Sequence, residues 1–172
     1  MNIVLIGMRG SGKTAVGRLL AVRLGRRLIE MDEMIREKAG MSINEIVARY
    51  GWTKFRKIES EVVRAAARLD NTVNATGGGV VTSKENLRVL KENGKLIWLR
   101  ARLETLLERI RNDSSRPSLT GKPPAEDMAQ TLAEREPIYR RAADLIVDTD
   151  GLTPEAVAEI IIKNLALEMK SG

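Results

Sequence analysis

The amino-acid sequence predicts an α/β fold in which helices cover both faces of a parallel sheet, and two observations carry this prediction. Five short apolar segments alternate with longer segments of helical periodicity along the 172 residues. Most of the short segments are apolar along nearly their whole length, as strands buried on both faces are. One domain, residues 1–172, suits this length. The predicted strands are residues 2–7, 27–32, 71–76, 95–100 and 144–149.

Start signals and apolar stripes mark helices between these strands. Residues 14–24 and 54–69 each place apolar side chains at helical spacing. Ser42 and Glu45 have the spacing of a capping box, and a threonine–proline pair at 153–154 predicts the start of a last helix. In sheets of this kind ligands bind at the carboxyl ends of the strands, so candidate site residues are sought there.

The composition excludes several classes of chemistry. The chain has no cysteine and no histidine, which excludes disulfides, thiolate metal sites and a thiol nucleophile. Any general base is then a carboxylate, a lysine or water. The net charge is +6, but aromatic residues make up only 3% and the basic residues are dispersed. These two features argue against a nucleic acid as the main ligand.

Nothing in the sequence predicts a membrane or export segment. No apolar run approaches the roughly 20 residues that span a bilayer, and the N-terminal segment MNIVLIG lacks the pattern of a signal peptide. We therefore expect a cytoplasmic location and no membrane partner.

The segment GMRGSGKT, residues 7–14, has the pattern of a phosphate-binding loop between a strand and a helix. Gly7, Gly10 and Gly12 permit backbone angles that turn successive N–H groups inward. Lys13 is then expected to reach the β- and γ-phosphates of a nucleotide, and Thr14 to offer its hydroxyl to Mg²⁺. The alternative is an ordinary glycine-rich turn.

Two carboxylates stand at the end of the second predicted strand. Glu30 and Asp32 are two residues apart, which places both on one face of a strand. Carboxylates there suit holding a metal-bound water or accepting a proton from a hydroxyl. The alternative is that Asp32 caps the following helix.

Three consecutive glycines, residues 77–79, follow the third predicted strand. Such a run packs poorly, so it favours close approach of the backbone to a ligand; a plain turn is the alternative.

Three arginines lie near these segments. Arg56 borders an apolar helix stripe, Arg135 precedes EPIY, and Arg116 lies in the one long stretch of turn-forming residues. Arginine binds carboxylates and phosphates through its planar fork, and a long loop is often a lid. Taken singly, each arginine is better explained by a surface ion pair, Arg56 with Glu59 and Arg135 with a neighbouring glutamate.

Taken together, these segments resemble the shikimate kinase family over nearly the whole chain. The stretches that carry the resemblance are, in order, GMRGSGKTAVGRLLA, EMD, FRKIE, TGGGVV, SRPSL and REPIY. The resemblance implies a three-layer P-loop kinase fold, with a five-stranded parallel sheet flanked by helices. It also implies substrate-binding helices at about residues 33–69 and a mobile lid at about residues 112–127.

The resemblance also implies an activity. The expected reaction moves the γ-phosphate of ATP, with Mg²⁺, to the 3-hydroxyl of shikimate in chorismate and aromatic amino-acid biosynthesis. A monomer is expected.

By resemblance, each candidate residue takes a role. Asp32 holds the reacting hydroxyl and acts as base, while Arg56 and Arg135 grip the shikimate carboxylate. The lid residue Arg116 contacts the transferring phosphoryl, and Arg109 lies against adenine. The other implied substrate contacts are Gly77, Gly78 and Gly79. The implied nucleotide contacts are Gly10, Ser11, Gly12, Lys13, Thr14, Ala15, Arg109 and Arg116, with Lys13, Asp32 and Arg116 catalytic. The implied metal contacts are Thr14 and, through water, Glu30.

Three positions depart from the family pattern. Glu30 replaces an aspartate and is one methylene longer, Ser118 replaces an apolar residue, and Arg9 stands where methionine is common. Two alternatives stay open: a P-loop kinase for another small acceptor, such as gluconate or a nucleoside monophosphate, and a non-catalytic nucleotide-binding module. The paired arginines and the three glycines argue against the first.

Overall fold

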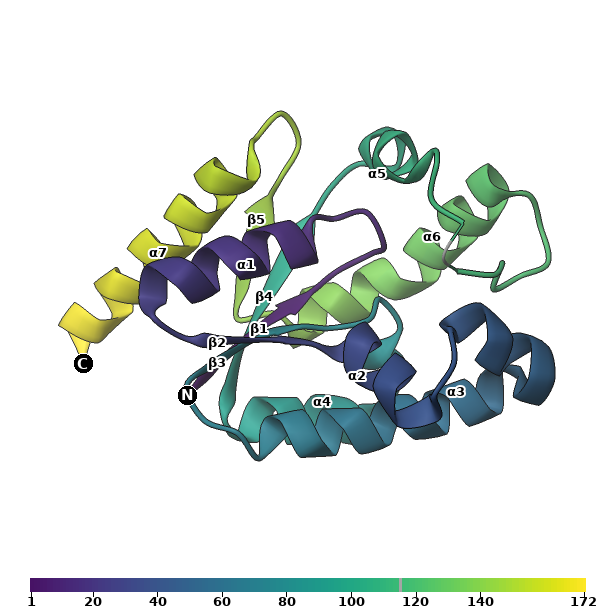
Figure 1. The fold of residues 1–172 in the computed structure, drawn as a ribbon. Coiled ribbons are helices and arrows are strands. Elements are labelled where there is room, and N and C mark those ends of the chain that lie inside the picture. The colour runs from purple at the N-terminus through teal and green to yellow at the C-terminus, as the bar shows by residue number, and fades with distance from the viewer. Residues whose placement is uncertain (115) are drawn as a thin grey trace.

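The computed structural model describes residues 1–114 and 116–172, and it is built on one five-stranded sheet (Figure 1). All the strands pair in parallel, in the order β2-β3-β1-β4-β5. The fold is therefore the predicted α/β fold. The strands are β1 (Asn2–Ile6), β2 (Arg27–Glu30), β3 (Thr72–Ala75), β4 (Gly94–Arg100) and β5 (Leu145–Asp148).

Each predicted strand is confirmed to within two residues, but the second ends earlier than expected. The prediction for 27–32 is wrong at its end, because Asp32 lies in the first turn of α2 (Met31–Ala39). Met31 and Ile35 are four residues apart and both buried, so the segment buries a helical face. Glu30 and Asp32 therefore do not share one face of a strand. Nor does the Asp32 side chain cap the helix, because the N-cap residue is Glu30.

Helices cover both faces of the sheet, as Figure 1 shows. α1 and α7 lie on one face, and α3, α4 and α6 lie on the other. The remaining helices are α1 (Lys13–Leu24), α3 (Ile43–Ala67), α4 (Lys84–Glu92), α5 (Leu103–Ile110), α6 (Pro124–Ala142), α7 (Pro154–Ser171) and a 3₁₀ turn at Val80–Thr82.

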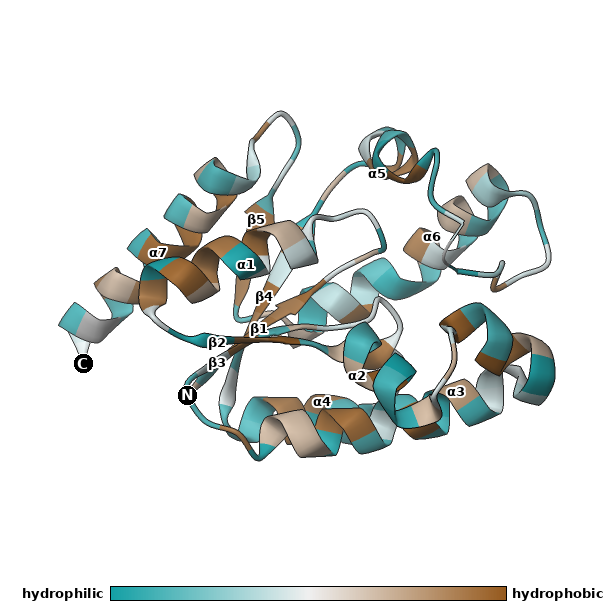
Figure 2. Cartoon of the chain, viewed as in Figure 1, coloured by the Kyte–Doolittle hydropathy of each residue, from teal (hydrophilic) through white to brown (hydrophobic). Residues whose placement is uncertain are grey.

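Two hydrophobic clusters, one on each face, hold these layers together. Along β1, Val4 and Ile6 point into the cluster under α3, α4 and α6, whereas Ile3 and Leu5 point into the cluster under α1 and α7. Figure 2 shows β1, in the middle of the sheet, as largely hydrophobic, in keeping with the burial of all of its residues.

The helix signals in the sequence are borne out. Ser42 and Glu45 form a complete capping box at the start of α3, and the Thr153 side chain accepts a hydrogen bond from Ala156 N at the start of α7. Helix α3 is kinked at Gly51, whose φ of 81° is one that favours glycine. The kink separates the first turns of α3 from the long segment that carries Arg56. Among the described residues, no helix is both long and apolar enough to cross a membrane.

Candidate active site

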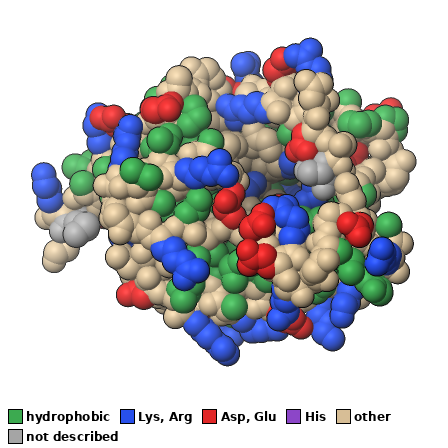
Figure 3. Space-filling view, in the orientation of Figure 1, with side chains coloured by type: hydrophobic (Ala, Val, Ile, Leu, Met, Phe, Trp, Pro, Cys, Tyr) green, Lys and Arg blue, Asp and Glu red, His purple; other side chains and the backbone are tan. Residues whose placement is uncertain are grey.

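One cavity of about 450 Å³ opens at the carboxyl ends of the strands. Its walls come from the loop after β1, from α2 and α3, from the glycines after β3, and from the lid and α6. Figure 3 shows the surface hollowed on this side, with Lys and Arg side chains around the hollow. The predicted site residues that line it are Gly10, Gly12, Lys13, Thr14, Ala15, Asp32, Arg56, Gly77, Gly78, Gly79, Arg109, Arg116 and Arg135.

Two predicted residues stand apart from this lining. Ser11 is buried within the loop, and its hydroxyl has no hydrogen-bond partner among the described residues. Glu30 lies at the end of β2, with its carboxylate 3.6 Å from Nη2 of Arg18. The predicted lid, 112–127, includes Ser115, which lies outside the described residues.

The loop after β1 has the geometry of an anion site. Gly7, Gly10 and Gly12 all have positive φ, at 144°, 85° and 95°, and these angles curl the backbone around the start of α1. The first hydrogen bond of the helix runs from Val16 N to Gly12 O. The N–H groups of residues 13–15 thus have no acceptor within the helix and, with the helix dipole, suit a phosphate.

Lys13 is held at the centre of this loop. Its ammonium donates to Gly7 O at 2.6 Å and to Met8 O at 2.9 Å. Burial lowers the pKa of Lys13 to about 7; the charge of Asp32 opposes the shift, and those of Arg116 and Arg135 add to it. A bound anion would raise the pKa of Lys13 again and stabilise the ammonium.

Asp32 receives the lid arginine in this structure. Nη2 of Arg116 lies 2.7 Å from each carboxylate oxygen of Asp32, and the Arg116 guanidinium also lies 5.1 Å from the centre of the Phe55 ring. The lid is therefore closed over the cavity, with its cation on the carboxylate of α2. A ligand group that binds Asp32 must displace Arg116.

Arg56 is fixed from behind by a buried carboxylate. Its Nη1 donates to Glu59 Oε1 at 2.9 Å, and its guanidinium packs over the rings of Trp52 and Phe55. Glu59 is only 1% exposed, and its other oxygen has no hydrogen-bond partner in the part of the chain that the structure describes. Burial raises the pKa of Glu59, and Arg56 opposes that shift. The predicted ion pair of Arg56 with Glu59 is confirmed, but it is not a surface pair. It involves a buried glutamate and holds Arg56 at the cavity wall.

Arg135 faces the same part of the cavity from α6. The alternative of an ion pair with a neighbouring glutamate is wrong: in the described part of the chain, Arg135 forms no ion pair within 4.0 Å. Burial lowers the pKa of its guanidinium. Two arginines therefore converge on one region, and only Arg56 has a carboxylate partner, which favours an anionic ligand group between them.

The three glycines make room for these side chains. None of them has a positive φ, so the backbone itself does not require glycine. A Cβ on Gly77 would lie 3.0 Å from Glu59 Oε2, and one on Gly78 would lie 3.2 Å from Arg135 Nη1. A Cβ on Gly79 would collide with the Arg56 guanidinium. Gly78 and Gly79 do lie in a turn, and the neighbouring side chains of Glu59, Arg135 and Arg56 would have to shift to admit a methyl group.

Arg9 and Ser118, the two other positions that depart from the family pattern, both form hydrogen bonds with residues of the predicted lid. Arg9 donates to the side chain of Asp113 and to its carbonyl oxygen, at 3.3 and 2.7 Å, which joins the phosphate loop to the base of the lid. The Ser118 hydroxyl accepts from Gly121 N and donates to Lys122 O, which closes a tight turn. Arg109 also touches the loop, donating to Gly10 O at 3.2 Å.

Comparison with known proteins decides the family. The family model for shikimate kinase matches residues 9–166. The chain belongs to the shikimate kinase family. The "Shikimate kinase" of Moorella thermoacetica is 46% identical over 170 residues, covering 99% of this chain and 97% of that protein. The one of Thermodesulfovibrio yellowstonii is 44% identical over 162 residues, with coverage of 94% and 93%.

Solved structures agree with the shikimate kinase assignment. The structure titled "Shikimate kinase from Acinetobacter baumannii in complex with shikimate" superposes with a TM-score of 0.93 at 34% identity, covering 97% of this chain and 93% of that one. The resemblance and the P-loop kinase fold predicted from the motifs are therefore confirmed.

Two important neighbours of the shikimate kinase cavity were missed as site residues. Glu59 carried a signal, because a glutamate four residues from Phe55 and three before Val62 interrupts an otherwise apolar stripe. Trp52, which lines the cavity, had none, since it looks like any other partly apolar helix residue.

Proposed function

We propose that this chain, as a shikimate kinase, transfers the γ-phosphate of ATP to the 3-hydroxyl of shikimate. The observation that carries the proposal is one cavity with a phosphate loop at one end, two converging arginines at the other, and the Asp32 carboxylate among its lining residues. The family assignment supports both substrates, and the Acinetobacter relative is titled as a shikimate complex.

The phosphate end suits ATP and Mg²⁺. The N–H groups of residues 13–15 and Lys13 would hold the β- and γ-phosphates, and Arg109 would lie beside the base. No group of three or more acidic residues that fits a metal occurs in the described part of the chain. Thr14 and phosphate oxygens would therefore supply the metal's contacts, with Glu30 acting through water. When bound, Mg²⁺ neutralises charge on the phosphates.

The other end suits a hydroxylated carboxylate. Arg56 and Arg135 would bind the shikimate carboxylate, and the backbone of Gly77, Gly78 and Gly79 would face the ring. Asp32 would then accept the proton of the 3-hydroxyl. Arg116 would move from Asp32 to the phosphoryl group in transfer and stabilise its negative charge.

An assay of ADP release tests this function directly. With Mg²⁺-ATP, we expect strong release with shikimate and little with quinate, gluconate, AMP or no acceptor. Release with another acceptor would keep the fold and the loop but overturn the roles of Arg56 and Arg135. Unchanged ATP binding with no acceptor-dependent release would favour the non-catalytic module.

ATP affinity should depend on pH through Lys13. The phosphates of bound ATP raise the pKa of Lys13 again, so binding takes up a proton above about pH 7 and none below it. Affinity should then fall as pH rises, by up to about tenfold per unit. Calorimetry in buffers of different ionisation enthalpy measures the proton uptake. Lys13→Arg, whose charge is permanent, should remove the uptake; no uptake by the parent at about pH 8.5 would contradict the prediction.

Gly79→Ala should weaken shikimate binding by displacing Arg56. The added methyl group occupies the place of the guanidinium, and loss of charge-assisted hydrogen bonds is expected to raise the KM for shikimate about tenfold or more. The KM for ATP should change little. In an Arg56→Ala background the same substitution should have little further effect, because its target is gone. Full additivity of the two changes would show that the methyl group acts elsewhere.

We also propose that the enzyme works as a cytoplasmic monomer. The residues that line the cavity supply both ends of the proposed site. Light scattering after gel filtration measures the mass of the active species, and a dimer at assay concentration would overturn this part of the proposal.

A further inference from the structure

Tyr139 is a buried polar group for which the proposed mechanism has no use. It lies on α6, one helical turn after Arg135, and its side chain is fully buried. Its hydroxyl donates to Gly78 O at 2.5 Å. Tyr139 is absent from the described residues that line the cavity, so it acts on any substrate only through its neighbours.

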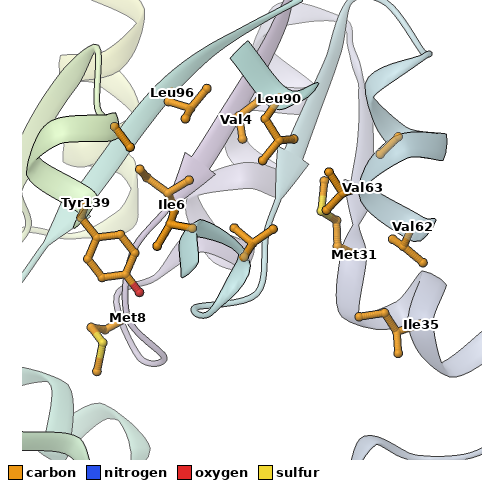
Figure 4. Packing of buried hydrophobic residues seen from close by; sticks show 14 of the residues in the cluster. Val4, Ile6, Met8, Met31, Ile35, Val62, Val63, Leu90, Leu96 and Tyr139 are labelled. Carbon is orange, nitrogen blue, oxygen red and sulfur yellow. The ribbon is translucent and has the colours of Figure 1, made fainter. Parts of the chain in front are cut away.

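The ring of Tyr139 has little freedom to move. It stacks on Trp98 of β4 with ring centres 5.6 Å apart and an angle of 28° between the planes. Figure 4 shows the ring lying beside Ile6 and Met8, near the end of β1. Packing of this kind fixes the rotamer of Tyr139. The hydroxyl is therefore held at one position, beside Gly78 O.

The hydroxyl of Tyr139 lies next to the end of the cavity that would bind the acceptor, which is formed by the glycines after β3 and by Arg135. The Arg135 guanidinium lies beside the glycine whose carbonyl oxygen accepts from the Tyr139 hydroxyl. Gly78 is confined on its other sides, because a Cβ there would lie 3.2 Å from Arg135 Nη1 and 3.4 Å from Gly7 O. The hydroxyl thus binds the backbone that would face the ring, and the cation that would face the carboxylate lies against the same glycine.

We propose that Tyr139 is a positioning residue, whose hydroxyl sets the Gly78 backbone and the Arg135 guanidinium at the spacing that the acceptor requires. The inference rests on the proposed function, since it presumes that shikimate occupies this end of the cavity. Because ATP binds at the loop end, the effect of Tyr139 is specific to the acceptor.

Tyr139→Phe is the direct test. It removes one oxygen and keeps the ring and its stacking on Trp98. We expect the Kd for shikimate, measured by calorimetry, and the KM for shikimate to rise roughly tenfold, while the Kd for ATP stays within about threefold. An unchanged shikimate Kd would overturn the inference, whereas failure of the unaltered protein to bind shikimate would overturn the proposed function on which it rests.

A matched variant separates positioning from general loss of stability. Leu90→Ala opens a cavity in the same hydrophobic cluster, away from the site, and is expected to cost about 2–5 kcal/mol. It should lower Tm at least as much as Tyr139→Phe but leave the shikimate Kd near that of the parent. An equal rise in Kd would reduce Tyr139 to an ordinary core residue.

A measurement on the unaltered protein covers the case in which Tyr139→Phe does not fold. The buried hydroxyl proton of Tyr139 should exchange slowly enough to be seen by NMR. Its resonance should move when shikimate binds and move little when ATP binds alone. A resonance that is insensitive to shikimate would overturn the inference.

Discussion

Asp32→Asn is expected to lower kcat by about 10²- to 10⁴-fold. ATP affinity should fall far less than kcat, since the lost charge acts on ATP only by lowering the pKa of Lys13 further. The amide keeps the size of the carboxylate but cannot accept the proton of the acceptor hydroxyl at neutral pH. It also loses the charge that draws the acceptor hydroxyl and Arg116 to this point. Single-turnover transfer to shikimate and equilibrium ATP binding measure the two quantities separately.

A neighbouring carboxylate supplies the control for Asp32. Glu33 lies one residue later in the same turn of α2 but pairs with Arg36 and does not line the cavity. Glu33→Gln should therefore leave both kcat and ATP affinity near those of the parent. If Asp32→Asn keeps kcat within a few-fold of the parent, Asp32 is neither the base nor the essential positioning group.

Arg116→Ala should slow turnover by about 10³-fold or more, with a much smaller loss of ATP affinity. The guanidinium is needed when negative charge spreads over the transferring phosphoryl, whereas Lys13 and the loop N–H groups hold ATP in the ground state. An interaction made only in the transition state lowers kcat without a matching change in ground-state binding. Steady-state kinetics with ATP as the varied substrate measure both parameters.

Arg111 offers a matched comparison for Arg116. It stands five positions before Arg116, forms an exposed ion pair with Glu108 and does not line the cavity. Arg111→Ala should be close to neutral, since exposed pairs contribute little. Equal losses of kcat and of ATP affinity in Arg116→Ala would mean that Arg116 binds nucleotide rather than assisting transfer.

The sequence predicts the sheet well because its signals are local. Strand segments such as 95–100 have an apolar centre, LIWL, and the pair Ser42 and Glu45 marks the start of a helix. The error at 27–32 arises where one apolar pattern fits both a strand and the first turn of a helix. The structure has a helix here, in which Met31 and Ile35, four residues apart, are buried on the same face.

For the site, too, features that are local in sequence could be predicted and those that depend on distant residues could not. Residues 7–14 could be recognised because a phosphate loop is contiguous in sequence. The partners of Arg116 and Arg9 could not, since Asp32 is 84 residues from Arg116 and Asp113 is 104 from Arg9. Such pairs depend on tertiary packing, and only the ordered set of motifs brought Arg56 and Arg135 together before the fold was in view.

The ion pair between Arg116 and Asp32 bears on the design of inhibitors. The carboxylate of Asp32 is paired with the cation of Arg116, while Arg56 and Arg135 face the same cavity. A molecule that copies only the shape of the acceptor offers nothing to replace that cation. A zwitterion with an anionic group for the two arginines and a cationic group for Asp32 complements the free enzyme at both ends, and it would compete with the lid itself.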